Sequence, residues 1–205
     1  MSPMNENQLH QIRDERKEQI MGAALKVFAR RGLAGTKMSM IAHEAGISHG
    51  LLYHYFKSKE ELFVSLVEEA MEGAEAAMKG ISEYPGTAID KIKALTKEIL
   101  DESGTPYFML IHQARTSEGV PEKAKELIDR LTMEWFVEQL LPVFVAGQQA
   151  GEIIPGDPRE LISTYLMVLS GLMTLDVEAY GYRMPNIELL LRLVAAAPPV
   201  SAREG

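Results

Sequence analysis

Apolar residues recur every three or four positions along most of the chain, which predicts amphipathic helices. A first helix carries a stripe that Gly32 should end, made of Ile20, Ala23, Ala24, Val27 and Phe28. Met38, Ile41, Ala42 and Ala45 mark a second and very short helix, and Leu52 and Phe56 would face inward from a third. Between the two short helices we expect a turn at Gly46, because glycine tolerates a positive φ.

Hydroxyl residues stand where several of these helices should begin. Thr36 and Ser48 are expected to cap the two short helices through their side-chain oxygens. The run Ser58-Lys59-Glu60-Glu61 has the pattern of a capping box and predicts a fourth helix from Ser58 past Lys79. Two short helices around a tight turn form a helix-turn-helix, which presents its second helix to a DNA groove.

The rest of the chain also reads as helical. Breaks at glycine and proline separate predicted helices over residues 87–102, 107–117, 121–149, 160–180 and 186–197. Pro142 should kink the longest of them, and the tail at 198–205 should be disordered. No segment alternates with the period of two that a strand requires, so the predicted fold class is all-α.

The N-terminal third resembles the DNA-binding domain of the TetR family of transcriptional regulators. The agreement lies in Ile20, Ala23, Ala24, Phe28, Gly32, Thr36, Ile41, Ala42, Ala45-Gly46-Ile47-Ser48, Gly50, Leu52-Tyr53, Tyr55-Phe56, Lys59-Glu60 and Leu62. Lys37 departs from the family, which often carries a second hydroxyl residue there, but a lysine can contact a phosphate by charge. The resemblance implies a helix-turn-helix domain at 14–74 and a helical ligand-binding and dimerisation domain at 75–197.

The charge of the chain is unevenly distributed. The formal net charge is −8, which by itself argues against DNA binding. Residues 1–60, however, hold nine Lys/Arg against six Asp/Glu, a balance of +3, and four of the five histidines. The remainder holds twelve against twenty-three, a balance of −11. A basic head on an acidic body indicates a local contact with DNA, although +3 alone would be ordinary scatter.

We assign DNA contacts on this basis. Base edges or their immediate neighbourhood are expected at His49, Gly50 and His54, with Ser48 capping the helix that carries them. Phosphate contacts are expected from Lys37, Ser39, Tyr53, Tyr55 and Lys59. A lysine in the first turn of a helix opposes the helix dipole, and a phosphate bound there would explain Lys59; a solvated side chain is the alternative.

The last two predicted helices are apolar nearly all round, so each should be buried on two sides. One side would be the chain's own core and the other a second subunit. The resemblance implies the same homodimer, through a four-helix bundle of the last two helices of each chain. We place Leu161, Leu172, Leu190 and Val194 in this interface. A buried central helix in a monomer is the alternative.

Methionine and aromatic residues in the body are suited to an adaptable apolar pocket. The predicted pocket for a small-molecule effector consists of Phe108, Met109, His112, Met133, Phe136, Tyr165 and Met173. Each of these is individually better explained as a core residue. Glu134 and Glu138, one turn apart, form either a solvated acidic face or a charge partner for a cationic ligand beside Trp135.

Other kinds of chemistry find no support in the sequence. The chain has no cysteine and none of the common nucleotide-binding, hydrolase or metalloprotease motifs, so we expect no enzyme activity, catalytic residue, metal or cofactor. No signal peptide or membrane span is recognisable, which favours the cytoplasm. The leading hypothesis is a repressor that leaves a palindromic operator when it binds an apolar or amphipathic ligand. The alternatives are an architectural DNA-binding protein without a ligand, and a helical small-molecule-binding protein or enzyme.

Overall fold

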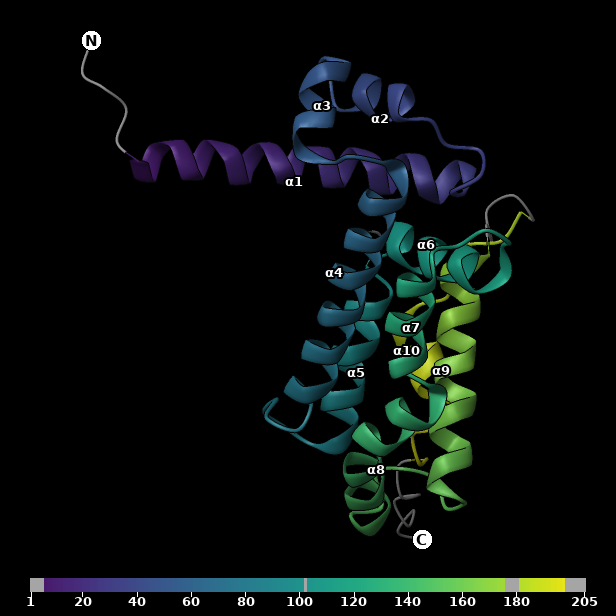
Figure 1. Cartoon of the computed structure of the whole chain (residues 1–205). Helices are drawn as coiled ribbons and strands as arrows, with labels where there is room; N and C mark the ends of the chain where they lie inside the picture. Colours follow the sequence, from purple (N-terminus) through teal and green to yellow (C-terminus); the bar gives the residue numbers. More distant parts are fainter. Residues whose placement is uncertain (1–5, 102, 176–180, 198–205) are drawn as a thin grey trace, which may run out of the picture. The chain divides into compact units, whose positions relative to one another are not determined.

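The computed structural model describes residues 6–101, 103–175 and 181–197, and within them most of the backbone is helical (Figure 1). The one pairing of extended backbone among these residues is an isolated bridge between Ile153 and Ala195. The predicted all-α fold is therefore confirmed. None of the described helices is long and apolar enough to cross a bilayer. The predicted tail at 198–205 lies outside the described residues.

The chain divides into two compact units, and each unit is discontinuous in sequence. The first consists of Met1–Met71 and Met109–Asp129, and the second of Glu72–Phe108 and Arg130–Gly205. Three helices, α4 (Lys59–Gly80), α6 (Thr105–Thr116) and α7 (Glu122–Arg130), therefore begin in one unit and end in the other, α7 by its last residue only. The domain boundaries at 14–74 and 75–197 stay a prediction.

The first unit is built on α1 (Glu6–Arg31), over which α2 (Met38–Glu44) and α3 (His49–Tyr55) lie together (Figure 1). The predicted apolar stripe of α1 is buried, and Phe28 meets Phe63 of α4 edge-on with ring centroids 5.2 Å apart. The second segment of this unit contributes part of α6 and most of α7 (Glu122–Arg130). Its buried side chains include Leu110, Ala114, Ala124, Leu127 and Ile128.

The second unit packs α5 (Ala88–Ile99), α8 (Met133–Gln149), α9 (Pro158–Thr174) and α10 (Ile187–Leu191) around one apolar core. A single polar pair crosses this core, in which the Tyr165 hydroxyl lies 2.6 Å from the hydroxyl of Thr96. Gly147 is required by close packing, because a Cβ atom there would come within 2.8 Å of the Ala88 Cβ. This unit therefore has a fixed packing of its own.

Two predicted helices of the body were wrong in extent. The segment 121–149 is two helices, because the Thr132 hydroxyl accepts a hydrogen bond from the Trp135 amide at 3.1 Å and so caps a new helix. Pro142 then lies inside α8. The last helix is shorter than predicted because the chain after it becomes extended: the Ala196 amide donates to the Glu152 carbonyl at 2.8 Å. The prediction for 160–180 holds as α9 up to Thr174, and residues 176–180 lie outside the described ranges.

Candidate functional site

The turn between α2 and α3 has the predicted geometry. Gly46 follows the end of α2 with φ 63°, and the Ile47 amide closes the turn by donating to the Ala42 carbonyl at 3.0 Å. Ser48 caps α3 as predicted, because its hydroxyl accepts from the Leu51 amide at 3.2 Å. A glycine that permits positive φ and a serine that caps the next helix thus fix the direction of α3.

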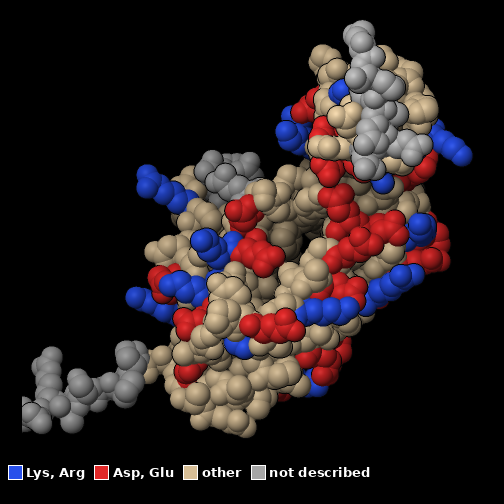
Figure 2. All heavy atoms as spheres, turned by 90° about the vertical axis from the view of Figure 1, so that its left-hand side faces the viewer, with Lys and Arg blue, Asp and Glu red and all other residues tan. Residues whose placement is uncertain are grey.

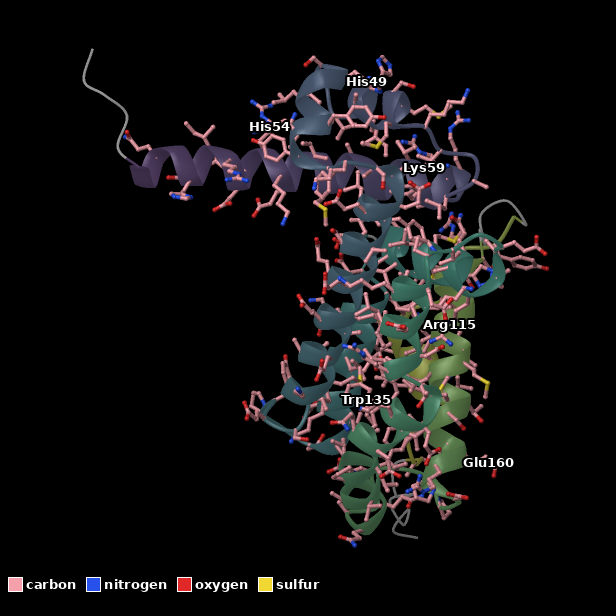
Figure 3. All side chains as sticks on the ribbon, in the orientation of Figure 1. His49, His54, Lys59, Arg115, Trp135 and Glu160 are labelled. Carbon is pink, nitrogen blue, oxygen red and sulfur yellow. The ribbon has the colours of Figure 1, made fainter. Side chains whose placement is uncertain are left out.

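α3 has one buried face and one exposed face. Leu52 and the following Phe56 are buried in the first unit. His49, Gly50, Tyr53 and His54 are exposed, and Figure 3 shows His49 and His54 on different sides of the helix. A Cβ atom at Gly50 would have no neighbour within 4 Å, so the glycine leaves the surface open. The exposed face therefore offers polar groups and space for a partner.

An aromatic pair stiffens the start of this exposed face. The rings of His49 and Tyr53 meet edge-on with centroids 4.8 Å apart, one helical turn from each other. Leu51 is also exposed, at 37%, and the sequence analysis did not select it. Because Leu51 adjoins the inward-facing Leu52 on the helix, its outward orientation could have been predicted from the sequence. An apolar side chain at this position suits contact with the methyl group of a thymine.

The other predicted DNA contacts differ in exposure. Lys37 and Ser39, at the start of α2, are exposed, whereas Tyr55 is half-buried with its ring edge-on to His54 at 5.7 Å. The predicted cap at Thr36 was wrong. Thr36 is buried and donates its hydroxyl to the Gly32 carbonyl at 2.6 Å, and the residue that precedes α2 is Lys37, which makes no side-chain cap.

Lys59 makes internal contacts that the sequence did not predict. Its ammonium group donates to the carbonyl oxygens of Leu33 at 2.8 Å and Thr36 at 3.1 Å. Two carbonyl dipoles thus compensate the cation, which explains a lysine in the first turn of α4 without a phosphate. An ammonium has three donors, so one remains for DNA, and the phosphate contact stays a prediction. The predicted capping bond of α4 is present, from the Glu61 amide to the Ser58 hydroxyl at 3.1 Å.

A further side chain binds what we call the 29–36 junction, which runs from the last turn of α1 to two residues before α2. Its carbonyl oxygens accept hydrogen bonds from the side chains of Lys59, Thr36 and Gln113. The Gln113 amide of α6 donates to the Ala29 carbonyl at 2.8 Å, while its own Oε1 atom is buried and has no partner in the described chain. Because α2 begins two residues after this segment, the junction sets where the helix-turn-helix starts.

Two more contacts hold α2 to α1. Gln19 donates its side-chain amide to the Ala45 carbonyl at 2.7 Å, and Arg30 pairs with Glu44 at 3.0 Å. The arrangement positions a short exposed helix on a rigid support, as groove recognition requires.

A profile of the family described as "Bacterial regulatory proteins, tetR family" matches residues 20–66, from the apolar stripe of α1 into α4. The helix-turn-helix part of the chain is thus of the TetR-family type. It is 28% identical over 139 residues to the fatty acid metabolism regulator protein of Bacillus subtilis, which covers 67% of this chain and 71% of that protein. To the uncharacterised HTH-type transcriptional regulator YerO of Bacillus subtilis it is 41% identical over 70 residues, or 34% of this chain and only 24% of that relative.

Solved structures of TetR-type regulators share the fold of this chain. The transcriptional regulator FadR from Bacillus subtilis, in complex with stearoyl-CoA, superposes with a TM-score of 0.59 at 24% identity, covering 86% of this chain and 94% of FadR. A protein from Saccharomonospora viridis in complex with choline gives a TM-score of 0.68 at 18% identity, covering 90% and 100%. At these identities the likeness shows the fold alone.

The four residues predicted for the dimer interface differ in burial, and the interface itself stays a prediction. Leu190 and Val194 are 5% and 1% exposed and belong to the core of their own unit, because the short α10 turns them inward. Leu161 and Leu172 are half-buried against that core. The exposed apolar side chains of α9 and the residues described after it include Met167, Leu175, Leu189 and Leu193.

The residues predicted for the effector pocket differ in burial, and the pocket stays a prediction. Tyr165 and Met173 are buried, Phe108, Met109 and Phe136 are half-buried, and His112 and Met133 are exposed. None of the seven lines either of the two cavities described for the second unit. The acidic pair also has an internal partner, since Arg159 binds Glu134 at 2.6 Å and Glu138 at 2.5 Å. The hypothesis of a cationic ligand at this pair is therefore not needed to explain it.

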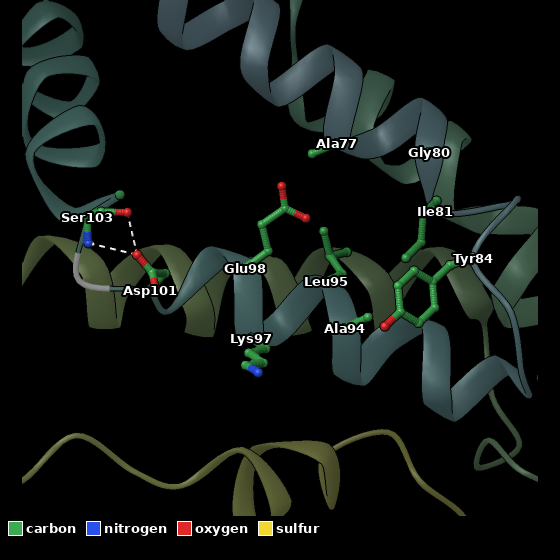
Figure 4. Close-up of a pocket in the computed structure, with 11 residues that line it drawn as sticks. Ala77, Gly80, Ile81, Tyr84, Ala94, Leu95, Lys97, Glu98, Asp101 and Ser103 are labelled. Atoms are coloured by element: carbon green, nitrogen blue, oxygen red, sulfur yellow. Dashed lines mark hydrogen bonds between the residues drawn. The ribbon is translucent and has the colours of Figure 1, made fainter.

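The larger cavity is a groove of about 550 Å³ between the end of α4, α5 and the segment before α6 (Figure 4). Its lining includes Ile81, Tyr84, Leu95, Glu98 and Asp101. The second cavity, of about 420 Å³, lies around residues 148–156. Among the described residues, no group of three or more His, Asp or Glu side chains could hold a metal ion.

Proposed function

We propose that this chain is a dimeric transcriptional repressor that reads a palindromic operator through α3 and leaves it when a small molecule binds the second unit. The observation that carries the proposal is the two-faced α3, which buries Leu52 and exposes His49, Gly50 and Tyr53 on a capped, supported helix. Such a helix suits the major groove, where base edges carry a distinguishable pattern of donors and acceptors.

The proposed contacts fall into two classes. His49, Gly50, Leu51 and His54 face base edges, and exposed groups at the start of α2, with Tyr53, face the phosphates. Acidic and basic side chains lie interspersed on the face shown in Figure 2, so the contact depends on the local groups of α2 and α3 rather than on the net charge. Base contacts specify the sequence, whereas phosphate contacts supply salt-dependent affinity.

A second copy of the chain is the proposed partner of the exposed apolar face. Met167 and Leu189 are 56% and 54% exposed, and Leu175 and Leu193 are similarly open. Exposed apolar residues on neighbouring segments favour a protein interface. A homodimer would present two α3 helices, which matches the twofold symmetry of a palindrome.

Regulation by a ligand is supported by the relatives and by the groove. Structures with this fold have been solved with stearoyl-CoA and with choline. The groove of about 550 Å³ has the size of a site for a small organic molecule. A ligand lowers operator affinity only if it binds the released state more tightly, and a tenfold loss corresponds to about 1.4 kcal/mol of coupling.

The test of DNA reading begins with selection of random duplexes by the purified protein, followed by fluorescence anisotropy on the selected sequence. A palindrome should be enriched, and His49→Ala should change the preferred bases at a cost of roughly 1–3 kcal/mol per contact. The matched control is Ser39→Ala, which should lower affinity for all sequences equally. Enrichment of no sequence would favour the architectural alternative.

The test of the dimer is sedimentation velocity at micromolar concentration. Met167→Glu and Leu189→Glu should give monomers and lower operator affinity, because two half-sites are no longer bound together. Ile12→Glu, which alters an equally exposed apolar residue on α1, should stay dimeric. A wild-type monomer would contradict the proposal.

A further inference from the structure

The groove between α4 and α5 exists because small residues face each other there. Ala77 and Gly80 of α4 lie opposite Ala94 of α5, and all three line the cavity. Ile81 and Leu95, only 4% and 3% exposed, form an apolar floor. Tyr84 closes one end with a ring that is 49% exposed, whereas Asp101 and Ser103 form the polar opposite end (Figure 4).

One exposed carboxylate between these ends has no partner in the part of the chain that the structure describes. Glu98 lies one turn from Leu95 on α5, and in Figure 4 its carboxylate points across the groove toward α4. The structure gives it no side-chain hydrogen bond or ion pair to any described residue. Asp101, at the polar end, accepts hydrogen bonds from the Ser103 hydroxyl and, at 3.0 Å, from the Ser103 amide. These bonds, the hydroxyl's first, hold the pKa of the Asp101 carboxyl below its ordinary value.

The neighbouring lysine side chains either bind other groups or point away from the Glu98 carboxylate. Lys79 pairs with Glu75 at 2.6 Å, and Lys91 donates to the Ser82 carbonyl at 2.6 Å. Lys97 lines the groove, but its side chain points away from the Glu98 carboxylate in Figure 4. The groove therefore combines an apolar floor, an aromatic ring and a negative charge that no side chain of the described chain neutralises.

We propose that this groove binds an amphipathic organic cation, with its charged nitrogen at Glu98 and its apolar body on Leu95 and Ile81 against the Tyr84 ring. An ammonium group supplies the missing countercharge, and an aromatic ring attracts a cation that lies over its face. The apolar body covers a floor of buried aliphatic side chains. This inference deepens the proposed ligand-released repressor and rests on it for its regulatory meaning.

A ligand in this groove also touches the start of α6. Gly104 lines the cavity, and its carbonyl accepts the amides of Tyr107 at 2.9 Å and Phe108 at 3.2 Å in the first turn of that helix. The same helix carries Gln113, which binds the Ala29 carbonyl of the 29–36 junction. A shift at the first turn of α6 can therefore reach the segment that positions α2.

The experiment uses three probes that share a carbon skeleton and differ in charge: 4-phenylbutylammonium, 4-phenylbutan-1-ol and 4-phenylbutyrate. Isothermal titration of the full-length protein at pH 7 should show the tightest binding for the ammonium and the weakest for the carboxylate. Glu98→Gln, which keeps the side-chain shape, should weaken ammonium binding at least tenfold and leave the alcohol unchanged. Glu83→Gln, an exposed acidic residue outside the lining, is the matched control and should bind like wild type.

Ala77→Leu fills the groove and should weaken the ammonium and the alcohol alike. The inference is overturned if the carboxylate binds as tightly as the ammonium, if no probe binds, or if Glu98→Gln binds the ammonium like a wild-type protein of equal melting temperature. Operator release is measured separately by anisotropy. Ammonium binding that depends on Glu98 without release would support the site and contradict the ligand-released repressor. Operator release by another compound, unaffected by Glu98→Gln, would support the ligand-released repressor and contradict the site at Glu98.

Discussion

Lys59→Met tests whether the 29–36 junction holds the DNA-binding unit together. Methionine keeps the length and most of the apolar surface of the lysine side chain, so packing is conserved. The substitution removes the ammonium that donates to the carbonyls of Leu33 and Thr36. We expect the protein to fold, with lower stability and lower affinity for operator DNA.

The expected loss of stability follows from the two carbonyl groups, of Leu33 and Thr36, that lose a donor. A hydrogen bond that involves a charged group contributes about 1.5–3 kcal/mol. The Leu33 carbonyl keeps a second donor, the Thr36 amide at 3.3 Å, so its loss is the smaller one. The Thr36 carbonyl keeps no other side-chain donor among the described residues, and Lys59 is half-buried rather than fully enclosed. We therefore expect a loss of about 2–3 kcal/mol, which lowers the melting temperature of a chain of this size by roughly 4–12 °C.

Circular dichroism during thermal unfolding measures the stability. Lys57→Met is the matched control, because the exposed Lys57 side chain makes no hydrogen bond to a carbonyl group of the described residues. Operator affinity is then measured between 50 and 200 mM salt, at a temperature where both variants are folded. A melting temperature within 2 °C of wild type would refute the role of Lys59 in the junction. A salt dependence that falls by about one unit per contact would show that the third donor of Lys59 also binds a phosphate.

Three further changes probe other contacts. Tyr165→Phe removes the hydrogen bond to Thr96 and should lower the free energy of unfolding by about 1 kcal/mol near neutral pH. Because burial raises the pKa of Tyr165, the wild type should lose stability as the pH rises past about 10. The variant should lose less stability than the wild type in an alkaline urea titration. Arg159→Gln should leave the melting temperature nearly unchanged, since its pairs with Glu134 and Glu138 are exposed to solvent, and a clear fall in thermal unfolding would contradict this. Gln113→Leu should change the free energy of unfolding in urea by less than about 1 kcal/mol, because the lost hydrogen bond to Ala29 is offset by removal of a buried unpaired oxygen. Equal losses for Gln113→Leu and Gln113→Glu would contradict this.

Sequence reasoning was accurate where neighbouring residues decide the structure. Gly46 turns the chain and Ser48 caps α3 because each acts on the backbone within a few residues of itself. Thr36 was misassigned because its hydroxyl had two local choices, the next helix or the carbonyl four residues before it. The partners of Lys59 lie 26 and 23 residues away in sequence, and no spacing rule identifies them.

The body was harder to predict for a related reason. An apolar stripe identifies a helix but does not say whether its second face meets the same chain or another one. Leu190 and Val194 belong to their own core because the chain after α10 becomes extended and pairs with residues 152–154. The groove at Glu98 was missed because small residues, rather than methionine and aromatic ones, create it.

The discontinuity of the first unit limits how this regulator can be recombined with others. A DNA-binding fragment cut near residue 74 would lack Met109–Asp129, whose Leu110 and Ala114 are buried and whose Gln113 binds Ala29. Such a graft should expose apolar surface and leave the Ala29 carbonyl without its side-chain partner. Exchanging only residues 38–55 avoids this, because both crossover points then fall outside the 29–36 junction. Operator specificity is thus transplantable as a short cassette, whereas the DNA-binding unit as a whole has to be transferred as two separate pieces of chain.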